Sequence, residues 1–127
     1  MNGRRYFLDT NAIVQVLAGN GGLLTLLSDA EYVATSIICE LEFLSFPSLP
    51  KEDILLFQRF KKRVEMIDLA SDDLPLKDRI LELRSVRKLK LPDAIIAASS
   101  IVGGCTLITA DRQLLNMKEL DAQGYAL

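Results

Sequence analysis

Short apolar runs alternate along the chain with segments whose apolar residues recur at helical spacing. The runs at 6–8, 31–35, 66–69 and 106–109 predict β-strands. Apolar positions three and four residues apart predict helices at 11–18, 23–27, 36–44, 51–64, 72–88, 93–102 and 111–117. Residues 125–127 predict an edge strand. Strands that alternate with helices are typical of a parallel sheet covered on both faces.

The longer helices are amphipathic. In the helix at 51–64 the inward positions are Ile54, Phe57 and Phe60, and the helix at 72–88 carries a stripe of Leu76, Ile80, Leu83 and Val86. With 127 residues, half of them hydrophobic and a quarter charged, the chain has the size and composition of one globular domain. We therefore expect a single domain over residues 1–127, built as a three-layer α/β/α sandwich around a mostly parallel sheet.

The compartment follows from cysteine usage and from the lack of long apolar segments. Cys39 and Cys105 stand in apolar surroundings, which favours free thiols and a reducing cytoplasm. No apolar run reaches the roughly 18 residues that a membrane helix needs, and the first residues lack the pattern of a signal peptide. We expect a cytoplasmic protein with no membrane contact.

Acidic side chains carry the candidate chemistry, because the chain has no histidine. Asp9 directly follows the first predicted strand, Asp111 follows the strand at 106–109, and Asp93 opens a helix. Glu40 and Glu42 lie two residues apart on the helix after the second strand, so they face different directions. Ligands of parallel α/β sheets bind beyond the carboxyl ends of the strands, where these acids fall. Each aspartate also suits a helix cap or first turn.

Carboxylates that gather in one place need a positive partner. Two of them about 4 Å apart repel by roughly 4 kcal/mol at an effective dielectric near 20. Oxygen ligands without histidine or cysteine suit Mg²⁺ or Mn²⁺ rather than zinc. Such a site activates water and offsets charge on a phosphate.

Four segments carry a resemblance: FLDTNAIV, TSIICELEFLSF, LPDAIIAAS and LITADRQLL, in that order. Together they resemble the PIN-domain nucleases, and most of all the small VapC-type toxins of bacterial type II toxin–antitoxin pairs. The resemblance covers essentially the whole chain. It implies a compact α/β/α fold and a metal-dependent endoribonuclease that hydrolyses RNA phosphodiester bonds.

The resemblance also implies the site residues. Asp9, Asp93 and Asp111 match the family's catalytic, metal-binding acids. Glu42, six residues after Ser36, is the favoured fourth acid, while Glu40, which Leu41 follows directly, is the alternative. The flanking polar positions, which orient ligands or waters, match Thr10, Asn11 and Thr109.

Substrate and partners are expectations of the same kind. The net charge is −2, but residues 51–90 hold eleven basic and eight acidic side chains, a local balance of +3. We expect RNA to be held by Arg79, Arg84, Arg87, Lys88 and Lys90, which precede Asp93. The family implies a cognate antitoxin protein and a homodimer, with the helices at 23–27 and 54–60 as candidate dimer surfaces.

Two other functions compete with the nuclease. The same scaffold could bind RNA or a protein without cleavage, and a failure to bind Mg²⁺ or Mn²⁺ would favour that binding module. A phosphatase of the haloacid-dehalogenase class needs a second aspartate two residues after Asp9, where Asn11 stands.

Overall fold

A computed structural model describes residues 4–127 and has a five-stranded, entirely parallel sheet at its centre. The strand order is β3-β2-β1-β4-β5. The strands are β1 (Arg5–Leu8), β2 (Tyr32–Ser36), β3 (Glu65–Ile67), β4 (Thr106–Ile108) and β5 (Ala122–Gln123). The helices are α1 (Thr10–Leu17), α2 (Gly21–Ser28), α3 (Ile37–Leu44), α4 (Lys51–Lys61), α5 (Leu74–Arg87), α6 (Leu91–Val102) and α7 (Arg112–Leu115).

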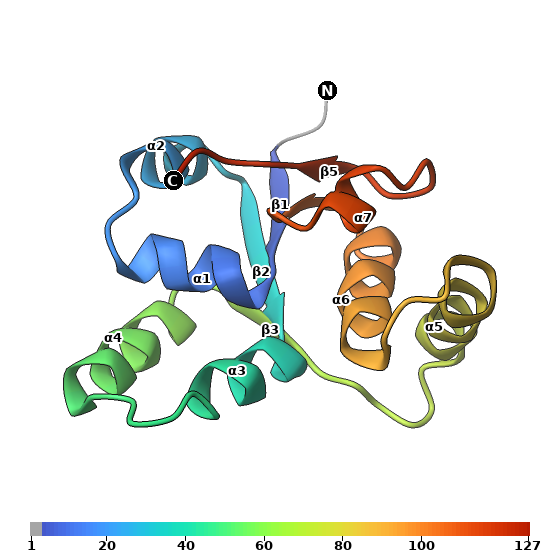
Figure 1. Ribbon diagram of the computed structural model, residues 1–127, viewed down its shortest axis with the longest axis horizontal. Helices are drawn as coiled ribbons and strands as arrows, with labels where there is room; N and C mark the ends of the chain where they lie inside the picture. Colours follow the sequence, from blue (N-terminus) through green and yellow to red (C-terminus); the bar gives the residue numbers. More distant parts are fainter. Residues whose placement is uncertain (1–3) are drawn as a thin grey trace.

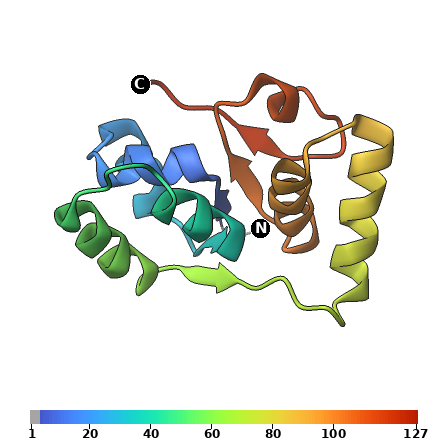
Figure 2. The ribbon, with the colours of Figure 1, turned by 60° about the horizontal axis from the view of Figure 1, so that its bottom comes forward.

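The helices form a layer on each side of the sheet. Figure 1 shows α1, α2 and α4 on one side and α5 and α6 on the other. Helix α3 starts where β2 ends and contacts both α1 and α6, so it closes the carboxyl end of the sheet between the two layers. The turned view in Figure 2 shows the same separation. The predicted α/β/α sandwich is confirmed.

The core lies where β1 and β4 meet α6, the helix with the most buried residues. Phe7 and Leu8 of β1 and Leu107 of β4 are at most 1% exposed. Seven consecutive residues of α6, from Ala94 to Ser100, are buried. Three of these are alanines, and small side chains let a helix approach a sheet closely. This packing fixes the start of α6, which carries Asp93, against the carboxyl ends of the strands.

Two sequence predictions about the elements are wrong. No strand forms at 125–127 among the described residues; the edge strand is β5, held by hydrogen bonds from Leu107 N to Asp121 O and from Thr109 N to Gln123 O. In α5, Leu76, Ile80 and Leu83 are buried, but Val86 is 64% exposed. Successive steps of three residues fall short of the 3.6-residue turn, so the apolar stripe has rotated away from the core by Val86.

The segments predicted as dimer surfaces are partly core. Leu23 and Phe57 are buried, whereas Leu24, Leu55 and Leu56 are exposed. Both cysteines are buried free thiols. Within residues 4–127, no single helix is long and apolar enough to cross a membrane, although α1 and α2 together would match the length and composition of a broken span.

Candidate active site

A pocket of about 350 Å³ opens where the chain changes direction across the sheet. From β1 the chain moves outward to β2 and β3, and it then returns to the other side of β1 to form β4 and β5. The connections therefore leave the carboxyl ends of β1 and β4 in opposite directions, which opens a crevice between them. The pocket is lined by Asp9, Thr10, Asn11, Glu42, Phe46, Asp93, Ile96, Ala110, Asp111 and Leu114.

Two of the acids are also helix caps. Asp9 follows β1 and caps α1, accepting a hydrogen bond from Ala12 N at 2.8 Å. Asp111 caps α7 and accepts from Leu114 N at 3.1 Å. In each case Oδ1 is the accepting atom, so the cap engages one carboxylate oxygen. The capping interpretation and the pocket-lining interpretation hold for the same side chains.

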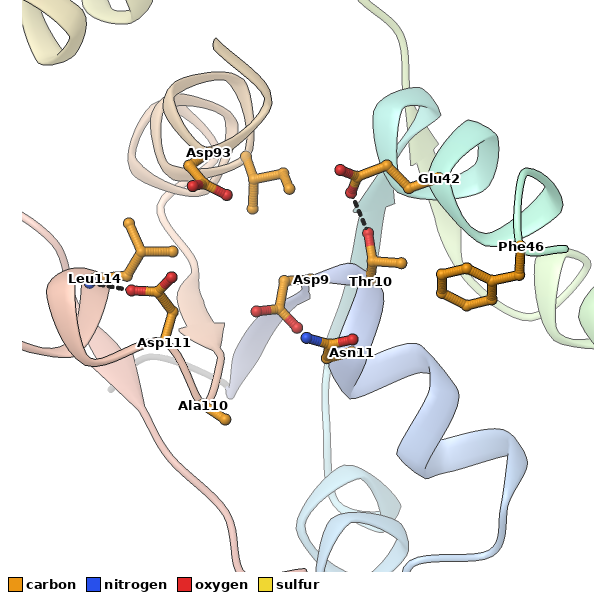
Figure 3. Close-up of a pocket in the computed structure, with 10 residues that line it drawn as sticks. Asp9, Thr10, Asn11, Glu42, Phe46, Asp93, Ala110, Asp111 and Leu114 are labelled. Carbon is orange, nitrogen blue, oxygen red and sulfur yellow. Dashed lines mark hydrogen bonds between the residues drawn. The ribbon is translucent and has the colours of Figure 1, made fainter. Parts of the chain in front are cut away.

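The other two acids reach the pocket from helices. Asp93 lies in the first turn of α6 and is half-buried. Glu42 projects from α3, and its Oε1 accepts a hydrogen bond from Thr10 Oγ1 at 2.5 Å. Figure 3 shows Asp9 at the centre of the pocket, with Asp93 and Asp111 on one side and Glu42 on the other.

The two glutamates of α3 have different surroundings. Glu42 lines the pocket, while Glu40 is 8% exposed and pairs through Oε2 with Lys61 Nζ at 3.0 Å. The second oxygen of Glu40, Oε1, is buried and has no hydrogen-bond partner in the described part of the chain. Of the two, Glu42 is therefore the one that faces the other acids.

The flanking polar residues connect the acids. Thr109 is fully buried; its Oγ1 accepts from Asp111 N at 3.0 Å, and its side chain lowers the pKa of Asp9 against the effect of burial. Thr10 holds Glu42, and the exposed Asn11 lines the pocket beside them. Thr109 thus holds the turn after β4 that carries Asp111, while Thr10 links the start of α1 to α3.

Burial and mutual repulsion shift two carboxyl groups. Burial raises the pKa of Asp9 above its ordinary value, and the charges of Asp111 and Asp93 add to the rise, although hydrogen bonds from Thr109 and Ala12 oppose it. Burial also raises the pKa of Asp93, with further contributions from Asp111 and Glu42, against an opposing effect of Lys90. The four acids therefore share one electrostatic environment.

The acids share a pocket without forming a closed ligand cage. Within residues 4–127, no three carboxylate or thiol side chains lie close enough together to hold a metal ion directly in their present positions. A pocket of about 350 Å³ has room for roughly ten water molecules at ~30 Å³ each. This geometry suits an ion that keeps part of its water shell.

Three of the five basic residues predicted to hold RNA have protein partners. Arg87 forms two hydrogen bonds to Glu119, at 2.8 and 2.6 Å, and Arg79 lies 3.5 Å from Glu82. Arg84 donates to Leu89 O. Lys88 and Lys90 are exposed and line a shallow depression on the connection from α5 to α6.

Sequence reasoning missed the apolar lining of this pocket, which consists of Ile96, Ala110, Leu114 and one aromatic residue, Phe46. Phe46 follows Glu42 by four residues, a spacing that places two side chains on the same face of a helix. That spacing was visible in the sequence, but the prolines at positions 47 and 50 marked the segment as a break between helices. The chain turns after α3 so that Phe46 still reaches the pocket.

Comparison with known proteins identifies the family. The family model described as the PIN domain matches residues 6–120, which is most of the chain. The chain belongs to the PIN-domain family. No curated protein sequence matches it.

Solved structures share the fold of this PIN domain. A chain of VapBC2 from Rickettsia felis, bound to a DNA fragment from its promoter, superposes with a TM-score of 0.78 at 22% identity, covering 95% of this chain and 98% of that one. VapBC-1 from nontypeable Haemophilus influenzae superposes with a TM-score of 0.75 at 18% identity, covering 94% of this chain and 96% of that one. DNA-bound VapBC from Salmonella typhimurium superposes with a TM-score of 0.74 at 19% identity, covering 95% of this chain and 98% of that one.

The raised pKa values predict how the stability of the metal-free PIN domain depends on pH. A carboxyl group whose pKa is higher in the folded chain than in the unfolded chain binds more protons when folded, so its contribution to stability falls as pH rises from near 3.8 through the raised value. Asp9→Asn removes this cost and keeps a capping side chain. In EDTA at pH 7 the variant should unfold at higher urea concentration than the parent, and the difference should shrink toward pH 4.

Asp73→Asn is the matched control, because Asp73 caps α5 in the same way but does not line the acidic pocket. It should leave the unfolding midpoint nearly unchanged at both pH values. If Asp9→Asn lowers the midpoint at pH 7, repulsion within the pocket is not a cost to the fold.

Proposed function

We propose that this protein is a divalent-metal-dependent endoribonuclease and the toxin of a toxin–antitoxin pair. The observation that carries the proposal is the convergence of Asp9, Glu42, Asp93 and Asp111 on one pocket at the crevice between β1 and β4. Membership of the PIN-domain family supports the nuclease, since that family's nucleases generally use divalent ions. The described relatives are crystallised as VapBC complexes, which supports an antitoxin partner.

The donor set fits Mg²⁺ or Mn²⁺. All the candidate ligands are oxygens, and the pocket contains no histidine or cysteine side chain among the described residues. Asp9 and Asp111 each have a carboxylate oxygen beyond the one used in capping; Asp93 lies on the same side of the pocket as Asp111, and Glu42 lies on the opposite side. When bound, a divalent cation would activate a water molecule and offset the negative charge of the phosphate.

The residues of the chain prepare this site before any ion binds. Thr10 fixes the Glu42 carboxylate, Thr109 fixes the Asp111 backbone, and the Ala12 N–H fixes the Asp9 side chain. The N-terminal ends of α1, α6 and α7 point partial positive charge toward the acids and lower the cost of keeping them ionised. The apolar walls Ile96 and Leu114 limit the water around the reacting phosphate.

The RNA substrate, the cytoplasmic location and the partners are parts of the same proposal. A homodimer is proposed on the basis of exposed leucines. Leu69, Leu81 and Leu91 line one recess beside α5 and α6, and Leu24, Leu55 and Leu56 lie on α2 and α4. The alternative is a PIN domain that binds RNA or protein without cleaving. Retention of all four acids in the pocket favours the enzyme.

The first prediction on activity uses the two glutamates as a matched pair. Glu42→Gln should lower metal-dependent cleavage of single-stranded RNA by at least about 100-fold, because it removes an interaction worth several kcal/mol at the reacting centre. Glu40→Gln should retain most of the activity, because Glu40 pairs with Lys61 away from the pocket. Asp9→Asn should be as inactive as Glu42→Gln. Initial rates with Mg²⁺ and Mn²⁺ measure these effects, and equal mild losses from both glutamates would contradict the assignment.

The second prediction separates the basic residues. Lys90 is exposed next to the acids, so Lys90→Gln should weaken the binding of a labelled single-stranded RNA and reduce the salt slope of log K by about 0.7, the loss of one phosphate contact. Fluorescence anisotropy in the Asp9→Asn background measures binding without cleavage. Lys62 lies at the C-terminal end of α4, in the opposite helical layer, so Lys62→Gln should change neither the RNA affinity nor the salt slope. An unchanged slope for Lys90→Gln would place the RNA elsewhere.

A further inference from the structure

Phe46 is exposed in a chain that otherwise covers its aromatic rings. The sequence has five phenylalanines and three tyrosines, all in the described part of the chain, and Phe46 is the only one of the eight that is exposed, at 38%. Tyr6, Phe7, Phe43 and Phe57 are at most 7% exposed. The exposed part of the Phe46 ring is apolar surface that a flat partner would cover on binding.

The Phe46 ring lies between the acidic pocket and a second recess that is mostly apolar. Phe46 lines the acidic pocket together with Asp9 and Glu42, and Figure 3 shows its ring facing the side of Thr10 and Asn11. It also lines a second recess of about 190 Å³, whose other walls are mostly apolar: Val14, Leu17, Ala18, Phe43, Leu49 and Asp53. A charged site and an apolar surface are thus continuous across one side chain.

Packing behind the ring holds it in place. The centroids of Phe46 and Phe43 lie 5.6 Å apart in a tilted arrangement, and Phe43 in turn stacks on Phe57 at 5.0 Å and 18°. Phe43 and Phe57 are buried, so this row of three rings is anchored in the core. A ring fixed in this way loses little conformational entropy when a flat partner binds to it.

We propose that Phe46 is a stacking platform for a nucleobase of single-stranded RNA, next to the phosphate that is cleaved at the acidic pocket. This inference rests on the proposed function, because it takes RNA as the substrate. The phosphate backbone does not suit the recess, since its walls are apolar apart from Asp53, whose charge repels phosphate. A base has an apolar π-face, and stacking on an aromatic ring is the usual way in which proteins hold unpaired bases.

Stacking of this kind tolerates any base, so the platform would add affinity and position the strand rather than read its sequence. It would also explain how a protein with an acidic pocket and few free cations beside it retains a polyanion. The cations Lys88 and Lys90 attract the backbone on the side of α6, and Phe46 holds a base on the side of α3.

The test compares Phe46→Leu and Phe46→Trp with Leu44→Ala, which removes an equally exposed apolar side chain, also 38%, from the end of α3 but outside the pocket. Phe46→Leu should raise KM for single-stranded RNA roughly tenfold, the loss of one stacked base, with the change in KM rather than kcat. Phe46→Trp should keep or lower KM, and Leu44→Ala should match the parent. Urea midpoints of all variants verify folding.

Substrates with a single abasic position provide the second arm. In the parent protein, one abasic position next to the cleaved bond should reproduce the rise in KM, and Phe46→Leu should add no further loss on that substrate. If Phe46→Leu has the parent's KM while Asp9→Asn is inactive, the stacking proposal is wrong and the nuclease stands. The stacking proposal is equally wrong if Phe46→Leu weakens only the binding of a partner protein.

A binding arm keeps the proposal testable if the parent cleaves no RNA and the proposed function fails. RNA that carries 2-aminopurine loses fluorescence when that base stacks. Quenching that Leu44→Ala retains and Phe46→Leu loses would support the platform without any cleavage. Equal quenching in all three proteins, or none, would overturn it.

Discussion

The gathering of like charges at the end of a parallel sheet is the constraint on which the rest of this structure depends. Asp9, Asp93, Asp111 and Glu42 reach one pocket because β1 and β4 are adjacent and their connections diverge. Burial and repulsion both raise the pKa of Asp9 and Asp93, so the fold bears a cost at neutral pH. That cost is the physical basis for assigning a cation to the pocket.

The N-terminal ends of helices reduce the free-energy cost of gathering these carboxylates. Asp9 and Asp111 each satisfy a backbone N–H of the helix that they cap, and Asp93 lies in the first turn of α6. An acid at a helix N-terminus is stabilised by the helix dipole as well as by the capping bond. The structural and chemical roles of these residues are therefore not alternatives. The same geometry that begins a helix also aims a carboxylate at the crevice.

The sequence predicts the places of Asp9 and Asp111 from chain topology, because both follow a buried strand, whereas Asp93 opens α6 and follows no strand. An acid directly after a buried strand must lie at that strand's carboxyl end, whatever rotamer it adopts. The glutamate is harder, because Glu40 and Glu42 differ only in the rotation of α3, and that rotation is set by packing and by the Lys61 pair. Arg87 is predicted to hold RNA because it precedes Asp93 in a basic segment, and its ion pair cannot be foreseen because Glu119 lies 32 residues away in sequence. The two-residue strand β5 carries too short a pattern to be recognised.

The most direct test of the central claim is anomalous scattering from crystals soaked in Mn²⁺. A divalent ion that offsets the repulsion should give an anomalous peak within the pocket, contacted directly or through water by Asp9, Asp93, Asp111 and Glu42. The peak should vanish in crystals of Asp9→Asn. A parent crystal that shows no peak in the pocket at saturating Mn²⁺, or one that binds the ion only elsewhere, would contradict the claim that these acids form a metal site.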